Sequence, residues 1–150
     1  MSLVVDASVA LKWVVAEPDS DVAKLLIPLE RDLFLPDFLL HEAANVLWVQ
    51  VRKRKFTPDE ARYAFPDLTA DITPVATQHL DLHPIALDIA IATNHPVYDT
   101  IYIAFALAVG ARAVVAADRA FHQAMRRHPD PAIAGMVLPL DEWARSRGIA

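Results

Sequence analysis

The stretch that decides the fold is Leu3-Val4-Val5-Asp6-Ala7-Ser8, a short apolar run that ends in a carboxylate. Valine-rich runs of this length are typical of strands buried on both faces, as in parallel sheets. Asp6 then stands at the carboxyl end of the strand, the edge at which ligands bind in open α/β sheets. An acid there is either a helix cap or a metal ligand, and the choice depends on whether other acids converge on it.

Outward from this strand, short apolar runs alternate with longer helical patterns. Further strands are predicted at 33–36, 72–76, 113–116 and 136–139, the second of these interrupted by Pro74. Such alternation predicts the α/β class, with a parallel five-stranded sheet covered by helices on both faces and a single domain over residues 1–150. The predicted helices are 7–15, 20–30, 38–55, 58–70, 84–93, 97–110, 121–127 and 140–147.

The composition restricts the class of protein further. The chain of 150 residues is 55% hydrophobic, so a well-packed core is expected. It contains no cysteine, which excludes disulfides and thiolate chemistry and suits a reducing cytoplasm. No apolar run approaches the ~20 residues of a membrane span, and no signal peptide is recognised. The net charge of −5 argues against a globally basic nucleic-acid surface, although a local basic patch remains open.

Three aspartates stand at predicted helix entrances, where capping alone would explain any one of them. Asp6 and Asp118 both follow short valine-rich strands, so both are expected at the same edge of a parallel sheet. Asp99 opens an apolar helix with no other charge until Arg112, so its first turn is expected to be buried.

Glu42 is the fourth candidate acid. At helical spacing its neighbours are Leu39, Val46 and Val49, so it is expected to interrupt a stripe that faces the core. A salt bridge to a buried arginine is the alternative explanation, and Asn45 could donate a hydrogen bond to it. Four acids gathered without cations would repel one another, and a hard divalent cation such as Mg²⁺ resolves the repulsion. Such a site suits phosphodiester hydrolysis.

Basic residues are the other feature relevant to a nucleic-acid substrate. The run 52–55 closes the long helix, either as a solvated end that complements the helix dipole or as a phosphate-contacting patch through Arg52 and Lys53. Arg119, Arg126 and Arg127 follow Asp118 and could hold RNA near the acidic edge. Other chemistry is poorly supported, because the three glycines form no phosphate-binding loop and Ser8 lacks the context of a nucleophile elbow.

Four short motifs, in this order and spacing, resemble the PIN-domain family, and most closely the VapC-type toxins of toxin–antitoxin pairs. They are LVVDAS at 3–8, HEAANVL at 41–47, VYDTIYIA at 97–104 and AADRAF at 116–121. The resemblance covers nearly the whole chain. It implies an α/β/α sandwich with strand order 3-2-1-4-5, and it carries an acidic quartet onto Asp6, Glu42, Asp99 and Asp118, with Ser8 beside the metal.

The resemblance also implies an activity and partners. The expected activity is that of an endoribonuclease dependent on Mg²⁺ or Mn²⁺ with water as the nucleophile. Asp6 and Asp99 are expected as the main metal ligands, completed by Glu42 and Asp118. A homodimer is implied, as is a VapB-type antitoxin whose extended segment lies in the groove leading to the acids.

One departure from the family's pattern keeps a second interpretation open. The family often has a threonine two positions before the last acid, where this chain has Ala116. An inactive PIN-like interaction module is therefore one alternative. A phosphatase of the haloacid dehalogenase type is another, but it normally needs a second aspartate where this chain has Ser8. The RNA that is cut and the identity of the antitoxin do not follow from the sequence.

Overall fold

A parallel sheet of four strands forms the centre of the protein. The computed structural model describes residues 2–149. The strands are β1 (Leu3–Val5), β2 (Leu33–Phe34), β3 (Ala113–Ala116) and β4 (Val137–Pro139), in the order β2-β1-β3-β4. All three pairings are parallel, and Val5 lies opposite Val115. The predicted α/β class and the relative order of these four strands are confirmed.

The predicted fifth strand at 72–76 is wrong. The segment forms only an isolated parallel bridge between Pro36 and Val75, beside β2. The Val75 amide donates to Leu35 O at 2.7 Å, and the Asp37 amide donates to Val75 O at 2.9 Å. Pro36 and Pro74 carry no amide hydrogen, so a longer ladder cannot form here.

Ten α-helices and one short 3₁₀ helix connect and flank the strands within residues 2–149. The long helices follow the sequence pattern closely, whereas the predicted helices at 7–15 and 20–30 are each broken into two shorter pieces, and α9 was not predicted. The helices are α1 (Ala7–Ala10), η1 (Leu11–Trp13), α2 (Ser20–Lys24), α3 (Leu26–Leu29), α4 (Leu39–Arg52), α5 (Pro58–Asp67), α6 (His83–Thr93), α7 (Val97–Val109), α8 (Arg119–Met125), α9 (Pro131–Ala134) and α10 (Leu140–Ser146).

Local signals fix where the helices begin and end. Thr57 and Glu60 form the predicted capping box at the start of α5, each side chain accepting from the other's backbone amide. Gly110, at φ +69°, ends α7 in the left-handed region that favours glycine. Ser20, in contrast, does not cap α2: its hydroxyl donates to Val15 O and accepts from the Glu17 amide.

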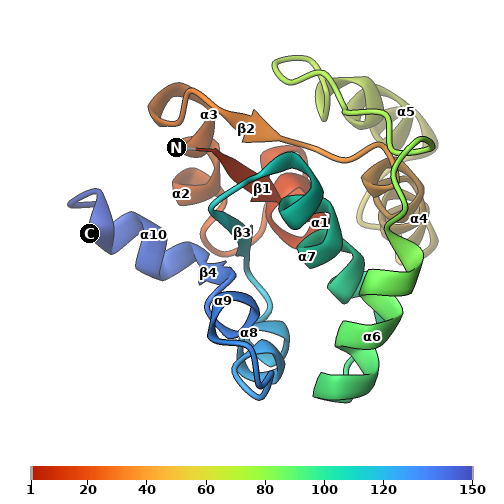
Figure 1. The fold of residues 1–150 in the computed structure, drawn as a ribbon. Helices are drawn as coiled ribbons and strands as arrows, with labels where there is room; N and C mark the ends of the chain where they lie inside the picture. The colour runs from red at the N-terminus through yellow and green to blue at the C-terminus, as the bar shows by residue number, and fades with distance from the viewer. Residues whose placement is uncertain (1, 150) are drawn as a thin grey trace.

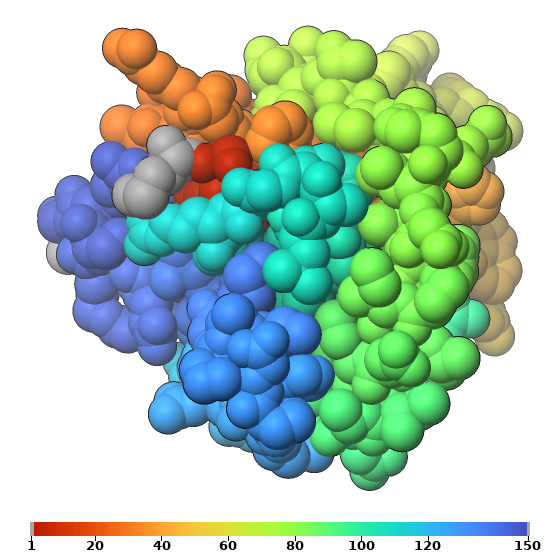
Figure 2. All heavy atoms as spheres, in the orientation of Figure 1, coloured from red at the N-terminus to blue at the C-terminus, as the bar shows by residue number. Residues whose placement is uncertain are grey.

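Helices pack around the sheet and enclose it. In Figure 1, α4, α5 and α6 lie to the right of the strands, and α2, α3 and α10 lie to the left. The apolar helix α7 packs directly on β1 and β3, and α10 packs on β3, β4 and α2. Residues of β1 and β3 are at most 5% exposed, and Figure 2 shows little of the N-terminal segment between its neighbours. The core therefore holds the carboxyl ends of β1 and β3 in place.

Within residues 2–149, no helix combines the length and the apolar character that crossing a membrane requires.

Candidate functional site

Two of the predicted acids extend from neighbouring strands at one edge of the sheet. Asp6 directly follows β1, and Asp118 lies two residues beyond β3. From β1 the chain passes to β2 on one side, and from β3 it passes to β4 on the other. The point at which the strand order reverses is where a crevice opens in folds of this type. Each aspartate also caps the helix that follows, Asp6 accepting from the Val9 amide at 3.2 Å and Asp118 from the Ala120 amide at 2.8 Å.

Asp6 is the most deeply placed of the acids, with 3% of its surface exposed. Its Oδ1 accepts the Ser8 hydroxyl hydrogen at 2.6 Å, and Ser8 Oγ in turn accepts from the Ala117 amide at 3.0 Å. Burial raises the pKa of Asp6 from 3.8 to about 7, against the lowering effect of the Ser8 and Val9 hydrogen bonds. The negative charges of Asp99 and Glu42 raise it further. The ionised form of Asp6 is thus energetically unfavourable in the folded protein.

Asp99 comes from the first turn of α7, but it is not the cap of that helix. The N-cap residue is Pro96, and the Asp99 side chain instead binds His95, with Nε2 to Oδ2 at 2.7 Å. Burial is the main cause that raises the pKa of Asp99, His95 opposes it, and the charge of Asp118 adds to it. The capping explanation of Asp99 is therefore wrong, and its carboxylate lies within electrostatic range of Asp118.

Glu42 lies in the first turn of α4, and the structure corrects its predicted surroundings. The stripe that faces the core is Leu39, Ala43 and Leu47, so Glu42 lies beside that stripe and is exposed. Its Oε2 accepts from the Tyr102 hydroxyl at 3.1 Å. The observed donor is thus a tyrosine of α7, where a buried arginine or Asn45 was the expected partner. Asn45 lines the same hollow as Glu42, one turn further along α4.

Electrostatic coupling links all four acids. Although Glu42 is exposed, loss of water around its carboxylate is the largest cause of its raised pKa; Tyr102 opposes the rise and the charge of Asp99 adds to it. Tyr102 is itself held neutral, because burial raises the pKa of its hydroxyl and the charges of Glu42 and Asp6 raise it further. Four chain segments therefore bring like charges together at the end of β1 and β3.

A divalent cation fits the chemistry of this set. Carboxylate oxygens are the ligands that Mg²⁺ and Mn²⁺ prefer. Burial is the main cause of the raised pKa values of Asp6 and Asp99, and a cation would relieve the smaller contribution from the neighbouring negative charges. Within residues 2–149, however, no three His, Asp or Glu side chains are arranged closely enough to hold a metal ion. Ser8, His95 and Tyr102 each engage an oxygen of one carboxylate instead.

The predicted basic residues lie at two separate places in the fold. Arg52 and Lys53 are exposed at the far end of α4, ten residues and roughly 15 Å along the helix from Glu42. The Arg52 guanidinium lies 5.6 Å from the centre of the Trp48 ring. Arg119 is close to Asp118 in sequence and exposed, and it pairs with Asp141 at 3.6 Å.

Two contacts of the acids were not predicted. Tyr102 donates a hydrogen bond to Glu42, 60 residues away in the sequence, and no local sequence pattern predicts such a contact. His95 precedes Asp99 by four residues, a spacing at which side chains can meet on one side of a helix. That spacing was the signal in the sequence that could have identified the histidine.

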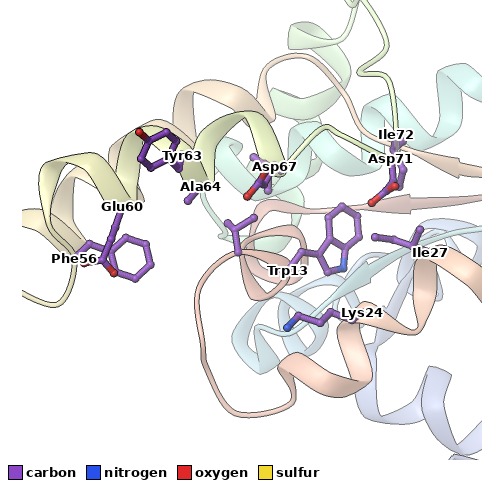
Figure 3. A pocket seen from close by; sticks show the side chains of 12 residues that line it. Trp13, Lys24, Ile27, Phe56, Glu60, Tyr63, Ala64, Asp67, Asp71 and Ile72 are labelled. Atoms are coloured by element: carbon purple, nitrogen blue, oxygen red, sulfur yellow. The ribbon is translucent and has the colours of Figure 1, made fainter.

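Two hollows of the surface differ in their relation to the acids. One, of about 780 Å³, is lined by Glu42 and Asn45 together with apolar residues of α4 and α7 such as Phe38 and Ile101. The other, of about 570 Å³, lies between η1, α2 and α5, with Trp13 and other side chains pointing into it (Figure 3). None of the four acids lines this second hollow. Of the four acids, Glu42 alone lines the first hollow.

Known proteins show the same architecture. The PIN domain family matches residues 3–126, a span that includes all four acids. Ribonuclease VapC3 from Pyrobaculum aerophilum is 28% identical over 113 residues, which are 75% of this chain and 86% of the relative. The crystal structure of PAE2754 from Pyrobaculum aerophilum shares the fold, with a TM-score of 0.68 and 18% identity over 99% of this chain and 90% of that one. Because the family match spans most of its length, this chain belongs to the PIN domain family.

Proposed function

We propose that this protein is a divalent-metal-dependent endoribonuclease and the toxin of a type II toxin–antitoxin pair. The observation that supports the proposal is the electrostatic coupling of Asp6, Glu42, Asp99 and Asp118, which come from four separate segments of the chain. The name of the relative, a ribonuclease, supports RNA as the substrate. We place the activity in the cytoplasm.

The roles of the residues follow from their positions. Asp6 and Asp99 would be the main ligands of Mg²⁺ or Mn²⁺, completed by Glu42 and Asp118. When bound, the cation would activate water and neutralise the charge that develops on the leaving oxygen of the phosphodiester. Ser8 fixes one oxygen of Asp6 and ties it to the backbone after β3. Tyr102 fixes one oxygen of Glu42.

The proposal is tested by cleavage of a panel of tRNA, rRNA and mRNA fragments with Mn²⁺ and with EDTA. Asp6→Asn and Asp99→Asn should each abolish the metal-dependent cleavage while leaving the circular dichroism spectrum unchanged. Asp130→Asn is the matched control, because Asp130 caps α9 through the Ala132 amide outside the acidic cluster. Full activity in both site variants, or equal wild-type activity in EDTA, would remove the metal mechanism. An absence of cleavage of every RNA would favour the inactive interaction module.

Two partners belong to the same proposal. A VapB-type antitoxin would place its extended segment in the groove beside Glu42, which is large enough for several side chains and lined by apolar residues. If a short neighbouring reading frame encodes it, its product should co-purify with this chain and inhibit cleavage. Failure to inhibit would argue against the pairing.

A homodimer is the second expected assembly. One face of α6 carries Leu87 and Ile91, one helical turn apart, which are 52% and 71% exposed. Apolar side chains gathered on one exposed helix face are a common basis of association. Sedimentation velocity at micromolar concentration tests it, and a monomer over the whole concentration range would exclude the dimer.

A further inference from the structure

His95 is the side chain that most directly controls how Asp99 is presented. Its Nε2 lies 2.7 Å from Asp99 Oδ2, and the two side chains are only 12% and 24% exposed. An ionised carboxylate can only accept, so Nε2 carries the hydrogen of this bond. A bond of this length from an imidazole to a carboxylate is short and directional. It fixes one oxygen of Asp99 and thereby sets the direction of the other.

The ring of His95 is itself held in place. It stacks on Phe121 with the ring centres 5.6 Å apart and the planes within 5° of parallel. Phe121 is fully buried in α8, the helix that Asp118 caps. His95 therefore connects the first turn of α7, which carries Asp99, to the helix that begins at Asp118.

The backbone before His95 is equally constrained. Asn94 ends α6 in the left-handed region at φ +51°, and the His95 amide donates to Ala90 O at 3.2 Å. Arg127 Nη1 donates to Thr93 O at 3.0 Å, so the segment that follows α8 also anchors the end of α6. Pro96 then begins α7 with a fixed φ. Little freedom is left for the histidine to move away from Asp99.

The Asp99 carboxylate needs a hydrogen bond that holds its orientation, because the neighbouring side chains are also acids. Its carboxylate lies within electrostatic range of Asp6, Glu42 and Asp118. A carboxylate on a free side chain would turn away from those charges in the absence of a cation. The hydrogen bond from His95 Nε2 to Oδ2 of Asp99 opposes that rotation.

We propose that His95 is a positioning residue that orients Asp99 toward the other acids for binding of the divalent cation. The inference rests on the proposed function and assigns a role to a residue outside the acidic quartet. Hydrogen-bond partners of this kind commonly fix the orientation of metal ligands, and losing one typically lowers metal affinity by 10–100-fold.

The test is the dissociation constant of Mn²⁺, measured by titration calorimetry without RNA. His95→Ala should raise it at least about tenfold. His95→Gln, whose amide nitrogen can reach the position of Nε2, should recover part of the affinity. His79→Ala, at an exposed histidine on the segment before α6, should leave it unchanged. Melting curves in EDTA establish that each variant is folded.

The possible outcomes separate this inference from the proposed function. A wild-type protein that binds no Mn²⁺ refutes both. If the wild-type protein binds Mn²⁺ and folded His95→Ala binds it equally well or more tightly, the positioning role is refuted and the proposed function is not. A purely structural role would lower the melting temperature equally with and without Mn²⁺ and leave the dissociation constant unchanged. If His95→Ala does not fold, His95→Leu takes its place, because leucine fills similar space without a hydrogen-bond donor. Weaker Mn²⁺ binding in folded His95→Leu than in His95→Gln supports the role, and equal binding in the two variants overturns it.

Discussion

Replacing Asp6 by asparagine should stabilise the metal-free protein, and should do so more at high pH than at low pH. Asparagine keeps the size of the side chain and an Oδ1 that can accept from Ser8 and Val9. It removes a carboxylate that is 3% exposed and faces the charges of Asp99 and Glu42. Loss of the charge is therefore the main change.

The sign of the pH dependence follows from the direction of the pKa shift. The pKa of Asp6 is raised from 3.8 to about 7, so the folded state holds its proton more tightly than the unfolded chain. The contribution of Asp6 to stability is then fully present below pH 3.8 and is lost as pH rises to about 7. At about 1.36 kcal/mol per pKa unit, the loss reaches about 4 kcal/mol above pH 7, of which about 2.5 kcal/mol falls between pH 5 and pH 8.

The assay is urea unfolding of wild type and Asp6→Asn in EDTA at pH 5 and pH 8. The stability advantage of the variant should grow by about 2.5 kcal/mol between the two values of pH. Glu42 and Asp99 titrate in both proteins, so the difference isolates Asp6. Asp130→Asn should show no such growth. A variant that is less stable than wild type at pH 8, or an advantage that does not change with pH, would refute the reasoning.

Two further results are expected. Asp99→Asn should melt at the same or a higher temperature than wild type in EDTA, because burial and the charge of Asp118 disfavour the ionised side chain. Adding Mn²⁺ should raise the melting temperature of the variant much less than that of wild type. An equal rise in both proteins would place the metal elsewhere. Replacing Arg52 and Lys53 with Gln should weaken RNA binding and flatten its salt dependence by about one unit of logarithmic slope for each phosphate contact that is lost. An unchanged slope in a filter-binding titration would leave the run as a solvated helix end.

The sequence predicted the parts of the fold that depend on local pattern. Two valine-rich runs, each followed by an acid, correctly predicted β1 and β3 with Asp6 and Asp118 at one edge of the sheet. The strand order that the family resemblance implied correctly placed the two strands side by side. The segment 72–76 failed because its apolar residues suggested a strand while Pro74 removed a donor that the ladder needs. Bridging to Pro36, another residue without an amide hydrogen, limited the pairing further.

The surroundings of the acids were harder to predict, because they depend on contacts between distant segments. The sequence predicted that Glu42 interrupts the core stripe, whereas its actual place beside that stripe depends on which face of α4 meets the core. Tyr102 was missed for the same reason, since only the packing of α7 against α4 brings it to Glu42. The roles of the quartet, of Ser8 and Asn45, and of the basic residues stay predictions.

A comparison of three aspartates within this chain separates the capping role from the proposed metal role. Asp6, Asp118 and Asp130 each accept a backbone amide hydrogen at the start of a helix. Asp118 and Asp130 do so while exposed, whereas Asp6 is buried beside other acids. Asparagine caps a helix about as well as aspartate and carries no charge to bury. Capping alone therefore does not explain an acid at position 6, and a bound cation would offset the cost of its ionisation.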